Sequence, residues 1–411
     1  MEPSQLLVII LFITTVSYLF NQLLDLANLR APRPGIPAEI AAFYNAEKYE
    51  QSRAYHRDRA RFGFLTSGLS FFLSLVMLLT GGFGWLDNLL HHFIEHEIFR
   101  ALAFFGIVGF VGDLITTPFQ WYATFVIEER YGFNKTTRST FISDKLKGYL
   151  VAAIVGGPVL SLFIYMAQLM GQDFWIWFSV VAIVLIFMIN VFYTTLFLPL
   201  FNKLTPLPDG ELKYAITSFA ADVNFPLDSV FVIDGSKRSS KANAFFSGLG
   251  KRKKIVLYDT LIDRHPKEEL IAVLAHEVGH FKKKHVIWMF LLSCVQIVFT
   301  LFILSRMLYA EEVSFALGGD QMSIPLNLLA FGILFSPISG LTGLLMNIFS
   351  RRNEFEADRY ARETFDGTAL STALKRLSVD TLSDLFPHPL YVFFHYSHPP
   401  LLQRLEALKN L

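Results

Sequence analysis

The sequence has one cysteine and few charged residues, and both shortages limit what the protein can be. Cys294 has no partner within the chain, which excludes an intramolecular disulfide and a zinc site built on cysteine. Histidine and carboxylate side chains must therefore hold any metal ion. Only 17% of the 411 residues are charged, too few to cover the surface of a soluble protein of this size. The formal net charge of +1 gives no sign of a nucleic-acid partner, and none is predicted.

Hydrophobic residues make up 53% of the sequence and gather in long blocks. A helix needs about twenty apolar residues to cross a bilayer. Seven blocks approach or exceed that length, at residues 6–26, 65–85, 101–123, 149–170, 174–200, 286–308 and 324–348. The sequence therefore predicts a multi-pass protein of the lipid bilayer. The first block has neither a basic leader nor a small-residue cleavage site, so we expect a retained span and not a signal peptide.

Lysine and arginine are unevenly distributed among the connections between these blocks. The first and third connections, the segment 201–285 and the tail from residue 351 are rich in both, whereas the other connections contain only Arg100. Basic loops remain on the cytoplasmic side of a membrane. We therefore expect the N-terminus outside and the C-terminus in the cytoplasm, as an odd number of spans requires.

The blocks and connections divide the chain into four parts. Residues 1–200 hold spans one to five with their loops, and residues 201–285 form a cytoplasmic region that ends in a helix. Residues 286–348 hold spans six and seven, and residues 349–411 form a C-terminal helical region. We expect the third ligand of any metal site in this last part.

A small sheet is predicted in the cytoplasmic region. Residues 228–233 form a short hydrophobic stretch that an Asp-Gly turn follows. Residues 243–246 and 255–258 flank a glycine-rich stretch at 248–251, which is the pattern of a β-hairpin.

The helix that follows carries the most informative pattern of the chain, an H-E-V-G-H pentad beginning at His276. Pro266 marks the start of this helix. Because residues four apart share one helical face, His276 and His280 can bind the same metal ion. Glu277 is then placed to act as the general base, taking a proton from water and passing it to the leaving amine. Only Gly279 interrupts the pattern, so we expect the helix to continue unbroken into the sixth span.

A catalytic zinc site takes three protein ligands and keeps a fourth position open. Glu354 is the predicted third ligand, because the seventh span ends near Ser350 and returns the chain to the same membrane border. Asp358 lies one turn further on the same face, where it can accept the outer ring N–H of a ligand histidine. Glu356 points to a different face and is expected to be solvated or salt-bridged. One zinc ion per chain is predicted.

A second candidate motif, H-F-I-E-H, occupies residues 92–96 in the short outer connection between spans two and three. It matches an inverted pattern known in metallopeptidases. Asp113 lies within a span, and Glu128 and Glu129 lie on the opposite side of the membrane, so none can complete it. We therefore interpret the motif as part of an amphipathic surface helix. Asp113 is costly in lipid and is expected to face the bundle interior or a chamber, with no chemical role assigned.

The chain resembles the type I CAAX prenyl proteases, which are integral-membrane zinc metalloproteases, over most of its length. The blocks that carry the resemblance are, in order, E-R-Y-G-F-N-K from Glu129, G-S-K-R-S-S from Gly235, N-A-F-F from Asn243, the pentad, F-E-A-D from Phe355 and Y-S-H-P-P-L from Tyr396. The resemblance implies seven transmembrane helices around a large water-filled chamber. It also implies a small cytoplasmic α+β region of the zincin type, with zinc at the cytosolic end.

For the metal ligands and the base, the resemblance implies the same residues as the pattern itself. It adds Asn243 as a residue that binds substrate backbone, His398 as a donor to the tetrahedral intermediate, and Arg404 as a residue that reaches the substrate or its carboxylate end. An edge strand carrying Asn243 can pair with an extended peptide. Each residue also has a plainer interpretation: Asn243 suits a turn, His398 can cap the last helix, and Arg404 suits a solvated position.

The predicted function is that of a membrane-embedded zinc endopeptidase acting on a peptide or protein, prenylated or not. Two alternatives stay open. One is a protease for membrane-protein quality control. The other is a transporter or channel with a structural metal, suggested by Asp113, Asn190 and Gln296 within spans.

The loops are shorter than in the better-known eukaryotic members of the family, and Glu356 stands where those members more often have glutamine. Compact versions are typical of bacteria. We therefore expect a protein of a bacterial inner membrane in preference to the endoplasmic reticulum.

Overall fold

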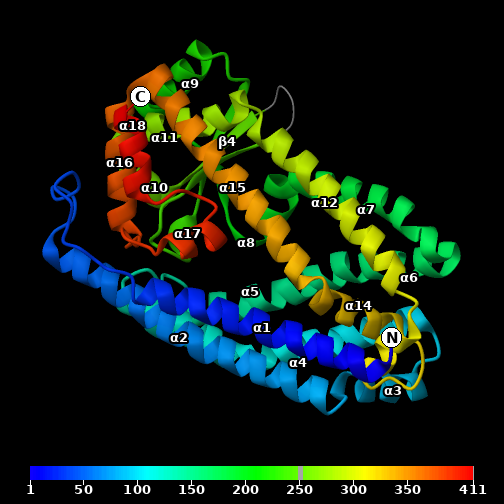
Figure 1. The fold of residues 1–411 in the computed structure, drawn as a ribbon. Coiled ribbons are helices and arrows are strands. Elements are labelled where there is room, and N and C mark those ends of the chain that lie inside the picture. The colour runs from blue at the N-terminus through cyan, green and yellow to red at the C-terminus, as the bar shows by residue number, and fades with distance from the viewer. Residues whose placement is uncertain (249–252, 411) are drawn as a thin grey trace.

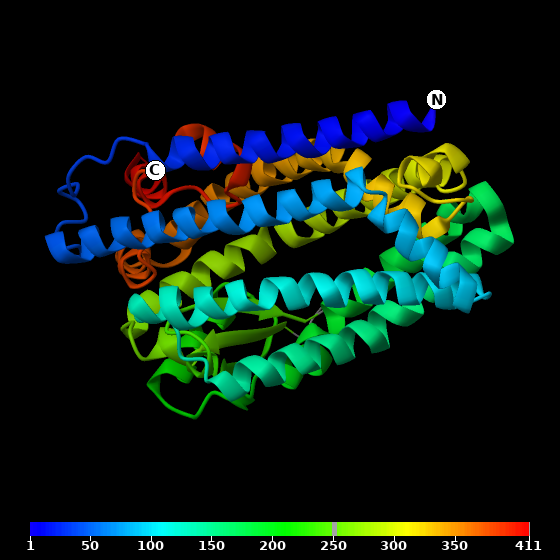
Figure 2. The same cartoon turned by 90° about the horizontal axis from the view of Figure 1, so that it is seen from below.

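The computed structural model describes residues 1–248 and 253–410. Long helices occupy one part of the molecule, and a small sheet with shorter helices occupies the other, where the C-terminus also lies (Figure 1). The helices of the first part are α1 (Pro3–Leu29), α2 (Ala46–Leu79), α4 (Glu97–Tyr122), α5 (Arg138–Val151), α6 (Gly157–Met170), α7 (Phe174–Phe192), α12 (His285–Met307), α14 (Ile324–Leu334) and α15 (Ser336–Ala361). Figure 2 shows α1, α2, α4 and α5 side by side.

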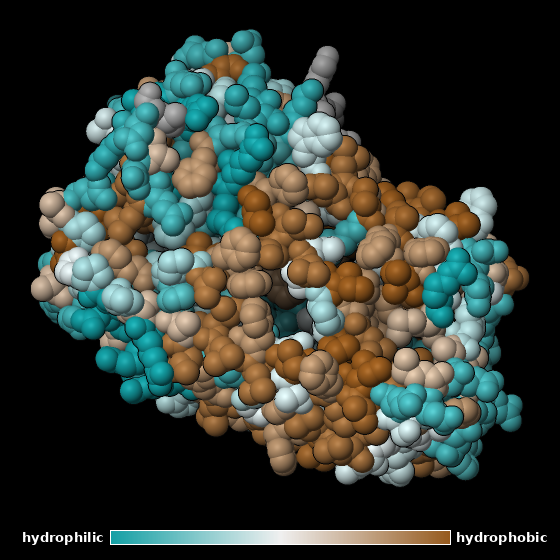
Figure 3. Space-filling model, viewed as in Figure 1, coloured by the Kyte–Doolittle hydropathy of each residue, from teal (hydrophilic) through white to brown (hydrophobic). Residues whose placement is uncertain are grey.

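Within the described chain, five helical stretches are long and apolar enough to cross a membrane. The count becomes six if α14 and α15, which meet at a bend of 51°, form one span. Large apolar side chains such as Phe72 and Leu114 are exposed on these helices, as lipid contact requires. In Figure 3 the surface is hydrophobic over the long helices, hydrophilic over the sheet region, and hollowed near its centre.

The longest stretch, residues 138–201, reverses direction at Gly171. The φ of Gly171 is +57°, in the left-handed region that glycine adopts without steric cost. The rings of Phe163 and Phe178 lie 5.0 Å apart between centroids. On a straight helix, fifteen residues would separate them by about 22 Å. Helices α6 and α7 are therefore antiparallel neighbours, matching the two predicted blocks at 149–170 and 174–200.

Among the described residues the sheet has four strands: β1 (Leu204–Pro206), β2 (Leu227–Ile233), β3 (Ala244–Ser247) and β4 (Lys253–Tyr258). Their order is β1-β2-β4-β3, with β2 and β4 parallel and the other two pairs antiparallel. The predicted strand and the pairing of the predicted hairpin are confirmed. Residues 249–251 of its glycine-rich turn lie outside the described residues. Strand β3 is an edge strand.

The helices of the sheet region are α9 (Glu211–Asp222), α10 (Asp259–Ile262), α11 (Lys267–Lys282), α16 (Gly367–Asp380), α17 (Pro389–His395) and α18 (Leu401–Asn410). Helix α11 begins after Pro266, as predicted. Its buried Leu274 and Val278 share one core cluster with Val230 and Leu257 of the sheet. Each buried side chain of this kind contributes roughly 1.5–3 kcal/mol. This packing fixes α11 against the sheet and leaves its histidine face directed away from the core.

The prediction of one unbroken helix from 266 into the sixth span is wrong. Helix α11 ends at Lys282, and α12 begins at His285. Between them, Lys284 has a φ of +59°, a left-handed conformation that stops an α-helix although neither glycine nor proline is present.

Two of the blocks that carry the family resemblance contact each other and join the sheet to the membrane helices. Asn134 and Ser239 form a β-bridge, and the backbone N–H of Lys135 donates to the carbonyl of Arg238 at 3.0 Å. The guanidinium of Arg238 donates two hydrogen bonds of 2.8 Å to Asp144 of α5. The loop that leads into β3 is thereby held against the helical bundle.

Asp113 on α4 has partners that the sequence did not identify. Lys145 on α5 donates to both of its carboxylate oxygens, at 2.7 and 2.8 Å, and the hydroxyl of Tyr149 also donates to it. Asp113 and Lys145 therefore form an ion pair that joins α4 and α5.

Candidate metal centre

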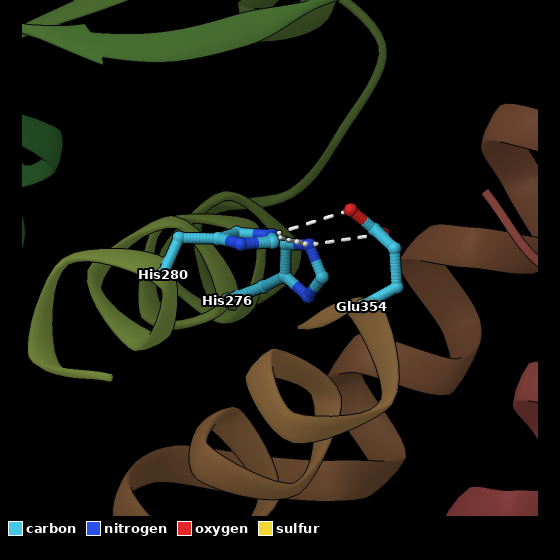
Figure 4. A group of neighbouring side chains, drawn as sticks. All are labelled: His276, His280 and Glu354. Carbon is cyan, nitrogen blue, oxygen red and sulfur yellow. Dashed lines mark hydrogen bonds and ion pairs between the residues drawn. The ribbon is translucent and has the colours of Figure 1, made fainter. Parts of the chain in front are cut away.

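Side chains from two helices that are distant in sequence converge on one point (Figure 4). The Nε2 atoms of His276 and His280, both on α11, lie 3.1 Å apart. The carboxylate of Glu354 on α15 lies 3.4 Å from Nε2 of His276 and 3.3 Å from Nε2 of His280. The structure thus brings together the three residues that the sequence proposed as ligands.

The two distances to Glu354, one to each carboxylate oxygen, lie in the range expected around a tetrahedral metal ion, and the distance between the imidazoles is slightly shorter. Donor atoms about 2.0–2.2 Å from such an ion lie roughly 3.3–3.6 Å from one another. One oxygen of Glu354 is buried and has no hydrogen bond, and a bound cation would provide a partner for it. Among the described residues, this is the single group of three or more potential ligands, and it offers three donors. Three donors are the number that a catalytic site uses, because the fourth position must remain free.

Gly279 is the reason that α11 and α15 approach closely enough. A Cβ at Gly279 would lie 3.0 Å from Cα of Ala357 and 3.1 Å from its carbonyl oxygen. Ala357 is fully buried, so neither backbone can move away freely. The small residues at this crossing therefore bring Glu354 within reach of both histidines.

Replacement of Gly279 by alanine is expected to weaken metal binding. The added methyl must displace α15 by a few tenths of an ångström, a form of overpacking that costs roughly 1–3 kcal/mol. Competition with a fluorescent zinc chelator should show an affinity at least fivefold lower. Gly343→Ala on α15, where a Cβ meets no atom within 4 Å, is the matched control. Equal affinities for Gly279→Ala and the wild type would contradict this account of the crossing.

Asp358 and Arg404 pack around His276, and Asp358 contacts the ring nitrogen that does not face Glu354. Oδ1 of Asp358 lies 2.8 Å from Nδ1 of His276, the outer nitrogen, as predicted. Although burial opposes it, hydrogen bonding to Asp358 and Glu354 raises the pKa of His276 to about 9. The carboxylates thus create a strong local preference for positive charge, which a divalent cation satisfies.

Arg404, on α18, is largely buried. Its guanidinium donates to both oxygens of Asp358, at 2.8 and 2.5 Å, and lies 3.3 Å from Glu354. A solvated position for Arg404 is therefore excluded. It holds Asp358 in place and forms part of the pocket wall beside the candidate ligands.

A pocket of about 300 Å³ opens beside the three candidate ligands. Glu277 lines it, and burial raises the pKa of this carboxyl group above its ordinary value. Asn243, exposed at the start of β3, forms another part of the wall. His398 is 65% exposed, with Nε2 3.3 Å from Glu354. All the predicted site residues except Asp358, which lies behind His276, therefore contact one pocket.

His285 is a residue of this site that the sequence analysis missed. Its Nδ1 lies 3.1 Å from Nδ1 of His280, and its Nε2 lies 3.2 Å from Glu356. Glu356 also pairs with Arg352 at 3.1 Å, so of the two expected environments, solvent or a salt bridge, the structure shows a salt bridge alongside the contact with His285. A third histidine five residues after the pentad was the signal that could have pointed here.

The rival motif at 92–96 does not form one helix, so that part of its interpretation is wrong. His92 lies in the last turn of α3 (Gly82–Phe93), whereas His96 is the residue before α4. Nδ1 of His92 lies 2.7 Å from the carbonyl of Asn88, one turn earlier. The described residues place no group of metal ligands there.

A helical membrane protein with two histidines and a carboxylate around a water-accessible pocket has the features of a membrane metallopeptidase. Comparison with known families agrees. Residues 25–203 match the family described as CAAX prenyl protease N-terminal, five membrane helices, and residues 206–411 match peptidase family M48. The chain belongs to the CAAX prenyl proteases of family M48, and it is a membrane metalloprotease.

Individual relatives match over nearly the whole chain. A CAAX prenyl protease 1 homolog of Arabidopsis thaliana is 36% identical, covering 96% of this chain and 95% of the relative. The CAAX prenyl protease 1 of Saccharomyces cerevisiae is 33% identical, covering 95% and 91%. The crystal structure of S. mikatae Ste24p superimposes with a TM-score of 0.91 at 32% identity, covering 98% of both chains. These relatives are eukaryotic, so the expectation of a bacterial inner-membrane protein has no support.

Proposed function

We propose that the protein is a zinc endopeptidase that binds one zinc ion per chain through His276, His280 and Glu354. The observation that carries the proposal is the convergence of these three donors beside a pocket that also contains Glu277. A bound zinc ion supplies a Lewis acid that polarises a peptide carbonyl and lowers the pKa of water.

The side chains around the ligands have distinct tasks in peptide hydrolysis. Glu277 accepts a proton from the attacking water and delivers it to the leaving amine, which a raised carboxyl pKa favours. His398 donates a hydrogen bond to the oxygen that becomes negative, an interaction worth on the order of 3 kcal/mol if well placed. Asp358 orients His276 through its outer nitrogen.

The substrate lies along the edge of the sheet in this proposal. Strand β3 is paired with β4 on one side only, so an extended peptide can pair with its other side. Asn243 at the start of β3 binds the peptide backbone. Arg404, in the pocket wall, reaches the carboxylate end of a short C-terminal product.

The relatives named above are CAAX prenyl proteases, and on that basis we propose that the protein releases the last three residues of a protein with a CAAX terminus. Their names favour this substrate over general quality control of membrane proteins.

A cleavage assay on two peptides of identical CAAX sequence, one farnesylated at cysteine and one not, tests the proposal. The farnesylated peptide is expected to show a kcat/KM at least tenfold higher, about 1.4 kcal/mol of additional transition-state binding. Mass spectrometry should detect the released tripeptide. Equal rates on both peptides would refute recognition of the lipid, and absence of cleavage on both would refute the proposed activity.

For the membrane arrangement we propose seven spans around a chamber. The reversal at Gly171 supports two spans within residues 138–201, and the bent pair α14 and α15 supplies one more. The hollow near the centre of Figure 3 is consistent with a chamber. The basic connections favour an outer N-terminus and a cytoplasmic C-terminus, with the metal centre at the cytoplasmic border.

The polar residues that suggested a transporter or channel are explained by their contacts within the protein. Asp113 pairs with Lys145, Gln296 donates to Thr342 at 3.0 Å, and Asn190 donates to the carbonyl of Ile186 at 2.8 Å. Each polar group is therefore satisfied by a local partner. A structural metal site would also need a fourth protein ligand, and the group in the described chain has three.

A further inference from the structure

We propose that His285 is a positioning residue of the metal centre: it accepts the outer N–H of His280 and is itself held by Glu356. This inference rests on the proposed function, because it takes His280 to bind the metal through Nε2. A ligand histidine almost always donates its other ring N–H to an acceptor that fixes the tautomer and the orientation of the ring. For His276 that acceptor is Asp358. For His280 the atom opposite is Nδ1 of His285, at 3.1 Å.

The positions of the protons follow from the geometry. When Nε2 of His280 faces the metal, its Nδ1 must carry the proton, so Nδ1 of His285 must be the acceptor. The proton of a neutral His285 is then on Nε2, which lies 3.2 Å from a carboxylate oxygen of Glu356. Each nitrogen thus meets a complementary partner, and the series ends in a carboxylate that Arg352 holds at 3.1 Å.

Burial makes these contacts obligatory for His285. The residue is 5% exposed, and a buried ring nitrogen without a partner is costly. Its ring lies nearly perpendicular to that of His280, with centroids 5.2 Å apart. Because His285 contacts the outer nitrogen of His280, it is on the far side from the metal and is not a fourth ligand.

The break between α11 and α12 is what makes the contact possible. On a continuous α-helix, residues five apart lie about 140° apart around the axis and do not touch. Here Lys284 adopts a left-handed conformation that ends the α-helical path, and His285 becomes the first residue of a separate helix. A non-glycine residue in this conformation costs about 1–2 kcal/mol, and such strain persists where the surroundings require it. The left-handed conformation of Lys284 therefore places His285 in contact with His280.

The test measures zinc affinity and the visible absorption spectrum of the Co²⁺-substituted protein, neither of which depends on turnover. His285→Phe keeps an aromatic ring, of somewhat larger volume, and removes the acceptor. We expect its zinc affinity to fall 10- to 100-fold and its Co²⁺ spectrum to shift. His285→Asn retains an acceptor oxygen close to the position of Nδ1 and should recover most of the affinity. Glu356→Ala, at a partly exposed position where folding is not at risk, should give a smaller loss.

His265→Phe is the matched control. His265 is another buried histidine paired with a glutamate, Glu269, at 2.7 Å, but it does not line the metal pocket. Its substitution should leave zinc affinity unchanged. The inference would be overturned if His285→Phe had the zinc affinity and the Co²⁺ spectrum of the wild type. It would also be overturned if His285→Asn were as impaired as His285→Phe, because that result would indicate that His285 contributes packing alone. A wild-type protein that binds no zinc would instead refute the proposed function.

Discussion

Glu277→Gln is expected to lower kcat for peptide cleavage by roughly two to four orders of magnitude while leaving about one zinc ion bound per chain. The amide has the shape of the carboxylate but cannot accept the proton of the attacking water. Glu277 lines the pocket beside the ligands without being one of them, so zinc content should be unaffected. Turnover is measured on the farnesylated peptide and zinc content by atomic spectroscopy.

The control for this variant lies on the same helix. Glu268 is in the first turn of α11, far along the helix from the pentad, and Glu268→Gln should retain wild-type turnover. Undiminished cleavage by Glu277→Gln would show that another group accepts the proton. Loss of zinc from that variant would show that Glu277 is a ligand and not a base.

Glu354→Ala is expected to lose zinc and, with it, all measurable cleavage. The substitution removes one of three donors and leaves the imidazoles of His276 and His280 facing each other at 3.1 Å with no carboxylate between them. Loss of a partner in the outer shell of a metal site already costs 10- to 100-fold in affinity, so loss of a ligand should cost more than about a hundredfold.

Two controls show whether the loss of zinc from Glu354→Ala is due to the loss of a ligand. Glu363→Ala, an exposed glutamate nine residues further along the chain, should bind zinc normally. Wild-type protein stripped of metal by a chelator should be inactive and should recover full activity with one equivalent of zinc. If Glu354→Ala binds zinc as tightly as the wild type, the third ligand is a different residue.

The sequence predicted that His276, His280 and Glu354 lie close together in space, because their pattern follows from helix geometry and chain direction. Spacing of four residues puts His276 and His280 on one face. A span that ends near Ser350 must return Glu354 to the border where the pentad lies. The strands of the sheet could also be predicted from the sequence, because a hydrophobic stretch followed by Asp-Gly is a local signal.

The sequence could not predict features that depend on tertiary packing. The helix break occurs at Lys284, a residue with no intrinsic preference for a left-handed conformation, so no local signal revealed it. The contact of His285 with His280 follows from that break and was missed with it. The partner of Asp113, Lys145, lies on a different helix, and the two are brought together only by the arrangement of α4 and α5.

The central claim, that α11 and α15 hold one zinc ion between them, is tested most directly by anomalous X-ray diffraction at the zinc edge. We predict a single strong peak within about 2.2 Å of Nε2 of His276, Nε2 of His280 and a carboxylate oxygen of Glu354. A peak at any other position, or a zinc ion that Glu354 does not touch, would contradict it.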